Sequence, residues 1–163
     1  MNSEIEIRKS LVPPSIELLF NNEQLELIKT LCLLYAFYLK SNRKFNKISD
    51  IVFYYSLINF DLIRIFDGNK NNTIKLERNL PFRFQTKINN ILLELSNLNY
   101  VVVKGELSYK INEISVKLTS EGIDFVNEIN IPFITELIEK YSFAINNIES
   151  TSANKNTIVG GVL

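Results

Sequence analysis

The sequence ILLELSNLNYVVV (residues 91–103) is followed by VKLTSEGIDFV (residues 116–126), and together these two stretches decide the fold. In the first stretch, apolar residues at helical spacing lead into a run of valines, which predicts a helix followed by a strand. In the second, Val116 and Leu118 alternate with polar residues, as in a strand with one buried face. Thr119 can then cap a following helix. The sequence therefore predicts a helix, a β-hairpin and another helix in immediate succession.

Two strongly apolar helices are predicted before this unit. The first follows Asn22, a suitable N-cap, and places apolar residues at spacings of three and four as far as Leu39. The second is predicted over residues 51–66, IVFYYSLINFDLIRIF. Both are apolar on more than one face, which indicates burial on several sides or a share in an interface. A short strand is predicted over residues 73–77, and the helix that leads into the hairpin over about residues 84–98.

After the hairpin, the sequence predicts two further helices and a tail. The first helix spans about residues 119–129, and Pro132 separates it from the second, over residues 133–148. From residue 150 the chain is polar and then interrupted by two glycines, so we expect a disordered tail. A chain of 163 residues is long enough for one core. We therefore expect a single domain over residues 1–149 and a tail over residues 150–163.

The order of helix, helix, helix, hairpin and helix is typical of a winged helix-turn-helix, in which the third helix and the hairpin wing can touch DNA. The wing is predicted to pair residues 100–103 with residues 114–118. Leu118, Thr119 and Gly122 match the LT-x-x-G pattern with which such proteins commonly leave the second wing strand. The predicted class is mainly α (α+β): a winged helix-turn-helix with a β-hairpin wing and additional C-terminal helices.

Charge and hydropathy exclude several classes of protein. Eighteen Lys and Arg balance eighteen Asp and Glu, so no global field draws the chain to nucleic acid or to an anionic membrane. The apolar run Leu31 to Leu39 is far shorter than the roughly 20 residues that span a bilayer. The N-terminal sequence MNSEIEIRKS lacks the pattern of a signal peptide. We expect a cytoplasmic protein that does not contact membranes.

The sequence offers little for catalysis or metal binding. It has no histidine, and its single cysteine, Cys32, lies in an apolar run, which favours a core residue over a reactive thiol. No Gly-rich loop resembles a phosphate cradle. Glu121, Asp124 and Glu128 lie three and four residues apart, the usual pattern of a solvated helix face rather than of a metal-binding loop. We expect no catalytic residue, no cofactor and no metal site.

The second predicted helix supplies a candidate protein interface. Its apolar residues form two stripes, which is more than one small core can absorb. Surplus aromatic surface usually marks an interface. We therefore predict that a partner protein contacts Phe53, Tyr54 and Phe60. The alternative, that these aromatic residues belong to the core, stays open.

A group of cations is the candidate nucleic-acid contact. It combines residues of the third predicted helix with residues of the insertion before it: Lys70, Lys75, Arg78, Arg83 and Lys87. The predicted wing adds no net charge, because its two lysines between residues 104 and 113 are balanced by two glutamates. Phosphate contacts supply most of the affinity for DNA. Ordinary solvated charges are therefore the favoured alternative for this group.

Several stretches along the chain resemble a known family. They are LLFNN (18–22), KISDIVFYYSLINFDLI (47–63), NLPFR (79–83) and LTSEGIDFVNEI (118–129), followed by a final helix that contains a tyrosine. In this order they resemble the middle component of ABC-three-component systems, the group that includes the small subunit of Lamassu-type bacterial defence. The resemblance covers about residues 16–148.

This resemblance implies a winged-helix subunit encoded beside an ABC or SMC-like ATPase and an effector, often a nuclease. Such a subunit bridges the ATPase and the effector in defence against phage or plasmids. The sequence departs from the family pattern in its polar insertion (residues 67–72) and in its non-basic wing, so we expect DNA contact only within the complex. The alternative is a winged-helix DNA-binding transcriptional regulator. A neighbouring gene for a coiled-coil ATPase favours the subunit, and an isolated gene beside a divergent promoter favours the regulator.

Overall fold

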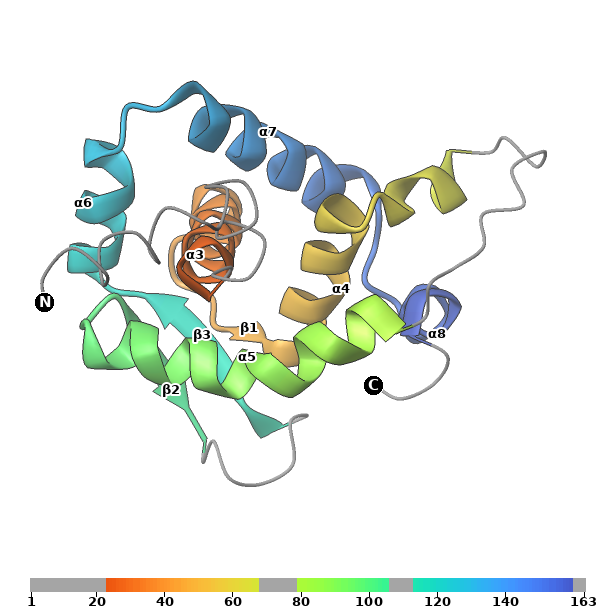
Figure 1. Cartoon of the computed structure of the whole chain (residues 1–163), viewed down its shortest axis with the longest axis horizontal. Coiled ribbons are helices and arrows are strands. Elements are labelled where there is room, and N and C mark those ends of the chain that lie inside the picture. Colours follow the sequence, from red (N-terminus) through yellow and green to blue (C-terminus); the bar gives the residue numbers. More distant parts are fainter. Residues whose placement is uncertain (1–22, 68–78, 106–112, 160–163) are drawn as a thin grey trace, which may run out of the picture.

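The computed structural model describes residues 23–67, 79–105 and 113–159 (Figure 1). These residues form a mainly helical structure with one three-stranded antiparallel sheet, which confirms the α+β class. Within them, none of the helices combines the length and the apolarity that crossing a bilayer requires. The elements in chain order are α3 (Glu23–Lys40), β1 (Asn46–Lys47), α4 (Ile48–Asn59), the 3-10 helix η1 (Leu62–Phe66), α5 (Asn79–Asn97), β2 (Val101–Lys104), β3 (Ser115–Leu118), α6 (Ser120–Glu128), α7 (Pro132–Asn147) and α8 (Ser152–Val159).

Helix α3 forms the centre of the molecule. It packs against α4, α5, α6, α7 and β3, and Figure 1 shows these elements around it. Leu31, Leu33 and Leu34 are exposed by 2%, 0% and 1%. Because neighbouring residues of a helix point in different directions, this burial requires packing partners on several sides. α3 is therefore a central core helix, one of the two interpretations that its apolar pattern allowed.

The buried apolar side chains of the described ranges form one core cluster that joins the helices to the sheet. Cys32 belongs to this cluster with 1% exposure, which confirms that it is a core residue. Burial raises the pKa of its thiol to about 12. The reactive form of a cysteine is the thiolate, so Cys32 is inert near neutral pH.

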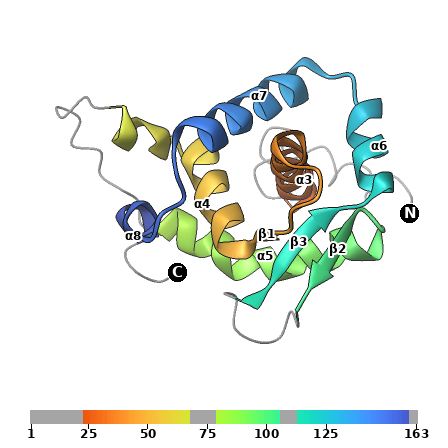
Figure 2. The same cartoon turned by 180° about the vertical axis from the view of Figure 1, so that it is seen from behind.

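The predicted hairpin is present, and a third strand lies beside it. β2 pairs with β3, with Val101 opposite Leu118 and Val103 opposite Val116, which confirms the predicted pairing. β1 pairs with the other side of β3 and gives the order β1-β3-β2 (Figure 2). β1 was not predicted from the sequence, because two residues carry no recognisable alternation.

The second predicted helix is interrupted. α4 ends at Asn59 and η1 follows from Leu62, so the prediction of one helix over residues 51–66 is wrong. Asp61 lies between the two elements with a φ of 55°. This left-handed conformation ends a right-handed helix, and Asp adopts it more readily than most residues do.

Helix α5 begins at Asn79 rather than near Phe84. Pro81 lies in its first turn, where a proline is tolerated because the missing N–H has no partner within the helix. At the other end, α5 turns into β2 through Asn99, which has a φ of 61°. The strand predicted over residues 73–77 lies outside the described residues.

The junction between β3 and α6 gives the LT-x-x-G pattern a structural reason. Thr119 Oγ1 accepts a hydrogen bond from Gly122 N (3.0 Å) and donates one to Asn99 O (2.5 Å). Thr119 is thus the N-cap of α6, as predicted. Gly122 packs against the backbone of Tyr100, where an added Cβ would overlap the carbonyl oxygen. A glycine at this position therefore lets α6 approach the start of β2.

The chain after α7 differs from the disordered tail that the sequence predicted, because Ser152–Val159 form α8. Lys155 Nζ lies 2.7 Å from Asp50 Oδ1 and donates a hydrogen bond to Ser49 Oγ (3.0 Å). Ile158 is 1% exposed, and α8 packs against α4 and α5. The polar composition of this segment predicted a disordered tail. The helix is nevertheless held against the rest of the protein by the side chains of Lys155 and Ile158. The folded part of the chain thus extends beyond the predicted boundary at residue 149.

Candidate functional site

The predicted aromatic interface on α4 lies inside the protein. Phe53 is 0% exposed and Tyr54 is 5% exposed. Their rings pack edge to face, with centroids 5.0 Å apart. Phe60 is half-buried and packs against Tyr55, with centroids 6.0 Å apart. This corrects the prediction for Phe53 and Tyr54: both are core residues that a partner protein does not reach.

The apolar faces of α4 are buried against the helices around it. α3, α5, α7 and α8 all pack against α4. Tyr55 stacks on Phe84 of α5 with ring centroids 3.6 Å apart, and Tyr54 OH donates a hydrogen bond to Ile148 O (2.6 Å). The exposed aromatic surface is smaller than the sequence predicted, because the sequence pattern does not reveal that α7 and α8 pack against α4.

The structure describes two of the five predicted nucleic-acid contacts. Lys70, Lys75 and Arg78 lie outside the described residues. Arg83 and Lys87 are exposed on α5. Lys87 Nζ lies 3.2 Å from Glu26 Oε1 of α3, so a carboxylate already neutralises its charge. The two described cations therefore do not make α5 a strongly positive helix.

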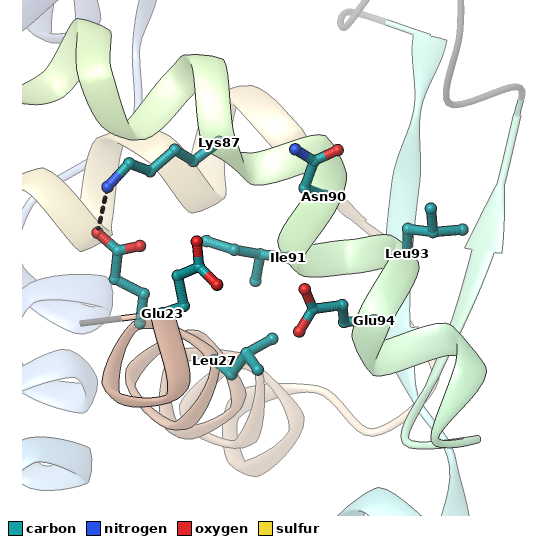
Figure 3. A pocket seen from close by; sticks show the side chains of 8 residues that line it. Glu23, Leu27, Lys87, Asn90, Ile91, Leu93 and Glu94 are labelled. Carbon is teal, nitrogen blue, oxygen red and sulfur yellow. Dashed lines mark hydrogen bonds and ion pairs between the residues drawn. The ribbon is translucent and has the colours of Figure 1, made fainter. Parts of the chain in front are cut away.

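A groove between α3 and α5 is a candidate binding site (Figure 3). Leu27 of α3 and Ile91 of α5 lie between the two helices and form an apolar floor. The groove has a volume of about 230 Å³. We call it the α3/α5 groove, and its lining residues are Glu23, Glu26, Leu27, Lys87, Asn90, Ile91, Leu93 and Glu94.

The α3/α5 groove carries a net negative charge. Glu23, Glu26 and Glu94 contribute three carboxylates to its lining, against the single ammonium of Lys87. Phosphates are repelled by such a surface, whereas Lys and Arg side chains are attracted to it. An apolar floor with carboxylates on both walls fits a protein segment that is apolar on one side and cationic at its edges.

The exposed face of α5 continues the apolar character of the groove. Phe82 and Leu93 are 51% and 49% exposed. They are separated by three turns of helix, so they lie on the same side of α5. Full burial of such a side chain contributes about 1.5–3 kcal/mol. Covering the exposed half of the Phe82 or Leu93 side chain therefore contributes on the order of 1 kcal/mol to association.

This site was not predicted from the sequence. The inward apolar stripe predicted for the third helix does not include Leu93. One signal for the site was present in the sequence: Phe82 and Leu93 interrupt the polar side of a helix at a spacing that keeps them on one face. The carboxylates of α3 could not be assigned to it, because the sequence does not show which side of α3 faces α5.

A second exposed apolar set lies on and next to α7. Ile131, Phe133 and Phe143 are 53%, 49% and 57% exposed. Phe143 also lines a hollow between α7 and η1. In this hollow Lys140 and Glu136 pair at 2.7 Å, and the hydrogen bond from Lys140 lowers the pKa of that carboxyl. The lining of this hollow also contains Asp61 and Glu139, so it carries three carboxylates against one ammonium, the same balance as in the α3/α5 groove.

The titratable groups of the core do not resemble catalytic groups. Among the described residues, no three or more His, Cys, Asp or Glu side chains gather where a metal ion can bind. Burial raises the pKa of Tyr55 and of Tyr141, as it does for Cys32. Catalytic nucleophiles and bases need a pKa that is lowered or close to neutral. The absence of enzymatic activity stays a prediction.

No family model matches the chain, and no curated protein or solved structure matches it significantly. The family that four sequence stretches resemble therefore stays a prediction.

Proposed function

We propose that this protein is a non-catalytic subunit that works by binding other proteins, with the α3/α5 groove and the exposed face of α5 as its main contact surface. The observation that carries this proposal is the half-exposed Leu93 beside the carboxylates of the groove. Protein interfaces place apolar anchors at the centre of a polar rim. The partner segment that fits this surface is amphipathic and carries Lys or Arg.

The topology supports a winged-helix interpretation of the fold. Three helices, α3, α4 and α5, precede the β2–β3 hairpin, and β1 lies between the first two. In the sheet order β1-β3-β2, β1 lies beside the hairpin and pairs with β3. In a winged helix-turn-helix, α5 is the recognition helix and the hairpin is the wing. We propose this fold, with α6, α7 and α8 as additional C-terminal helices.

The charges around α5 argue for a protein partner rather than for DNA. A helix that reads the major groove needs cations and amides on its exposed face, because phosphates surround it. α5 offers Arg83 and the amide of Asn90, whereas Lys87 is paired with Glu26. Glu94 lies on the same helix, beside the groove. Insertion of this helix into DNA would place the carboxylate of Glu94 close to phosphates.

We propose that the partners are an ABC or SMC-like ATPase and an effector such as a nuclease, which the protein bridges in the bacterial cytoplasm during defence against phage or plasmids. This identity rests on the resemblance of four sequence stretches to the middle component of ABC-three-component systems. A bridging subunit needs two separate contact surfaces. The α3/α5 groove and the exposed apolar residues of α7 supply two surfaces on different helices.

The experiment is purification of the tagged full-length chain, expressed together with the genes that neighbour its own. We expect a coiled-coil ATPase to co-purify at constant stoichiometry. A chain that purifies alone, and that binds one operator about a thousandfold more tightly than random DNA, would overturn the proposal in favour of a transcriptional regulator.

A further inference from the structure

Two lysines lie over one aromatic ring on the three-stranded sheet. Lys104 Nζ is 5.0 Å and Lys117 Nζ is 6.0 Å from the centre of the Phe45 ring. Lys104 belongs to β2 and Lys117 to β3, and Phe45 directly precedes β1. The face of an aromatic ring attracts ammonium groups. Phe45 therefore holds two like charges close together.

The strand register places these residues on the face of the sheet that points away from the core. Lys47 and Lys104 both lie opposite Ser115, from the two sides of β3. Lys117 shares that face, because alternate residues of a strand point the same way, and the intervening Val116 is 0% exposed. We define the outer sheet face, on the strands shown in Figure 2, as Phe45, Lys47, Val102, Lys104, Ser115 and Lys117.

The outer sheet face is positively charged, although the chain as a whole is neutral. Across the described ranges, no ion pair joins its three lysines to a carboxylate. Arg43 and Lys44 are exposed directly before Phe45 and add to the same charge. Glu113, the carboxylate that precedes β3, is exposed and forms no ion pair with another described residue. The outer sheet face and the α3/α5 groove therefore have opposite signs.

We propose that the outer sheet face binds the phosphate backbone of nucleic acid without reading its sequence. Neighbouring strands lie about 4.8 Å apart, so the backbones of Lys47 and Lys104, on either side of β3, are about 10 Å apart. A DNA duplex carries one charge per about 1.7 Å of its axis, so a sheet face of this width lies opposite several phosphates. Lysine supplies a point charge that suits phosphate and has no planar fork to match a base edge.

An acidic protein is the competing class of ligand, and the composition of the face disfavours it. Protein interfaces depend on apolar anchors that become fully buried. Among the described residues of this face, Val102 is the one exposed large apolar side chain, with 49% exposure, so the face offers a protein little apolar surface to bury. The Phe45 ring is covered by the two lysines. This proposal uses different residues from the proposed function, so either one can fail without the other.

The test measures binding of the full-length protein to a fluorescent random-sequence duplex by anisotropy, at a series of salt concentrations. The Lys104→Gln/Lys117→Gln variant removes two cations, and the Lys104→Arg/Lys117→Arg variant keeps them. Each lost phosphate contact lowers the slope of log K against log salt by about 0.9. We expect the glutamine variant to have a slope shallower by about 1.8 and weaker binding at low salt. The arginine variant is expected to bind like the wild type.

The matched control is Arg83→Gln/Lys87→Gln, which removes two cations from α5 and is expected to leave the slope unchanged. The proposal is overturned if the wild type does not bind the duplex, if the strand variant keeps the wild-type slope, or if the control lowers the slope equally. Displacement of the duplex by polyglutamate at equal charge concentration would assign the face to acidic proteins and would also overturn it.

Thermal unfolding checks the fold of each variant. If the double glutamine variant unfolds, the single Lys104→Gln variant is expected to lower the slope by about 0.9.

Discussion

Lys87 Nζ of α5 lies 3.2 Å from Glu26 Oε1 of α3 and bridges the two walls of the α3/α5 groove (Figure 3). Of the two cations of α5, Lys87 is therefore paired with a carboxylate of α3. It also leaves Glu23 and Glu94 as carboxylates of the groove without an ion pair among the described residues. The sign of this surface, and with it the kind of partner it accepts, follows from this arrangement.

Glu26→Gln tests whether this ion pair contributes mainly to surface charge or to stability. The Lys87 side chain is 53% exposed and that of Glu26 is 19% exposed. Ion pairs with a solvated partner contribute about 0–1 kcal/mol and are screened by salt. We expect the free energy of unfolding to fall by less than about 1 kcal/mol in low salt, and the difference to fade in high salt. Urea denaturation at two salt concentrations measures it. A larger loss that persists in high salt would contradict a surface role.

Gly122→Ala is expected to destabilise the protein. An added Cβ would overlap Tyr100 O, a backbone atom that is held in place by a hydrogen bond from Thr119 N. Forced overlaps of this kind cost about 1–3 kcal/mol, which exceeds the gain of about 1 kcal/mol from replacing a helical glycine by alanine. The matched control is Asp124→Ala on the exposed side of α6, expected within about 0.5 kcal/mol of the wild type. Equal melting temperatures for the two variants would contradict the close approach of α6 to β2.

Stability is expected to fall at alkaline pH. Burial raises the pKa of Cys32 from 9.0 to about 12. A group whose pKa is higher in the folded state stabilises fully below its unfolded pKa and less as pH rises towards the folded value. The contribution of Cys32 is therefore lost between about pH 9 and 12, and the buried Tyr141 acts in the same direction. Chemical denaturation across this range measures the slope, which Cys32→Ala is expected to reduce. A stability that rises with pH would contradict the burial of these groups.

Ile158→Ala is expected to weaken the whole fold rather than only the end of the chain. Ile158 is 1% exposed on α8, which packs against α4 and α5. Truncation of a buried isoleucine to alanine costs about 2–5 kcal/mol. Asn156→Ala changes an exposed residue of the same helix and serves as the control. If both variants unfold at the wild-type denaturant concentration, α8 does not belong to the cooperative core.

The sequence predicted those parts of the fold that local patterns determine. The alternation of Val116 and Leu118 located the hairpin, and Thr119 located the start of α6, because each signal is contained in a few neighbouring residues. β1 escaped prediction because it exists only by pairing with β3. α8 escaped it because Lys155 is anchored to Asp50, far away in the chain.

The candidate sites depended even more on long-range packing. Phe53 was predicted to lie at an interface, and only the arrangement of α7 and α8 around α4 shows that it is core. The α3/α5 groove and the outer sheet face each combine residues from separate elements. No spacing along the chain marks such combinations, so the sequence could supply their residues but not their assembly.

The central claim is that the α3/α5 groove and the exposed face of α5 bind a protein partner, and Leu93→Asp tests it most directly. Leu93 is 49% exposed and lines the groove, so the substitution introduces a charge at the proposed anchor with little effect on the core. Leu98→Asp is the matched control, because Leu98 is 53% exposed but does not line the groove.

The measurement is the dissociation constant of each folded variant for the co-purifying ATPase. Loss of an anchor residue costs about 2 kcal/mol or more, which corresponds to about thirtyfold weaker binding. We expect Leu93→Asp to weaken binding by at least about thirtyfold and Leu98→Asp to bind like the wild type. A folded Leu93→Asp variant that binds the ATPase as tightly as the wild type would contradict the account.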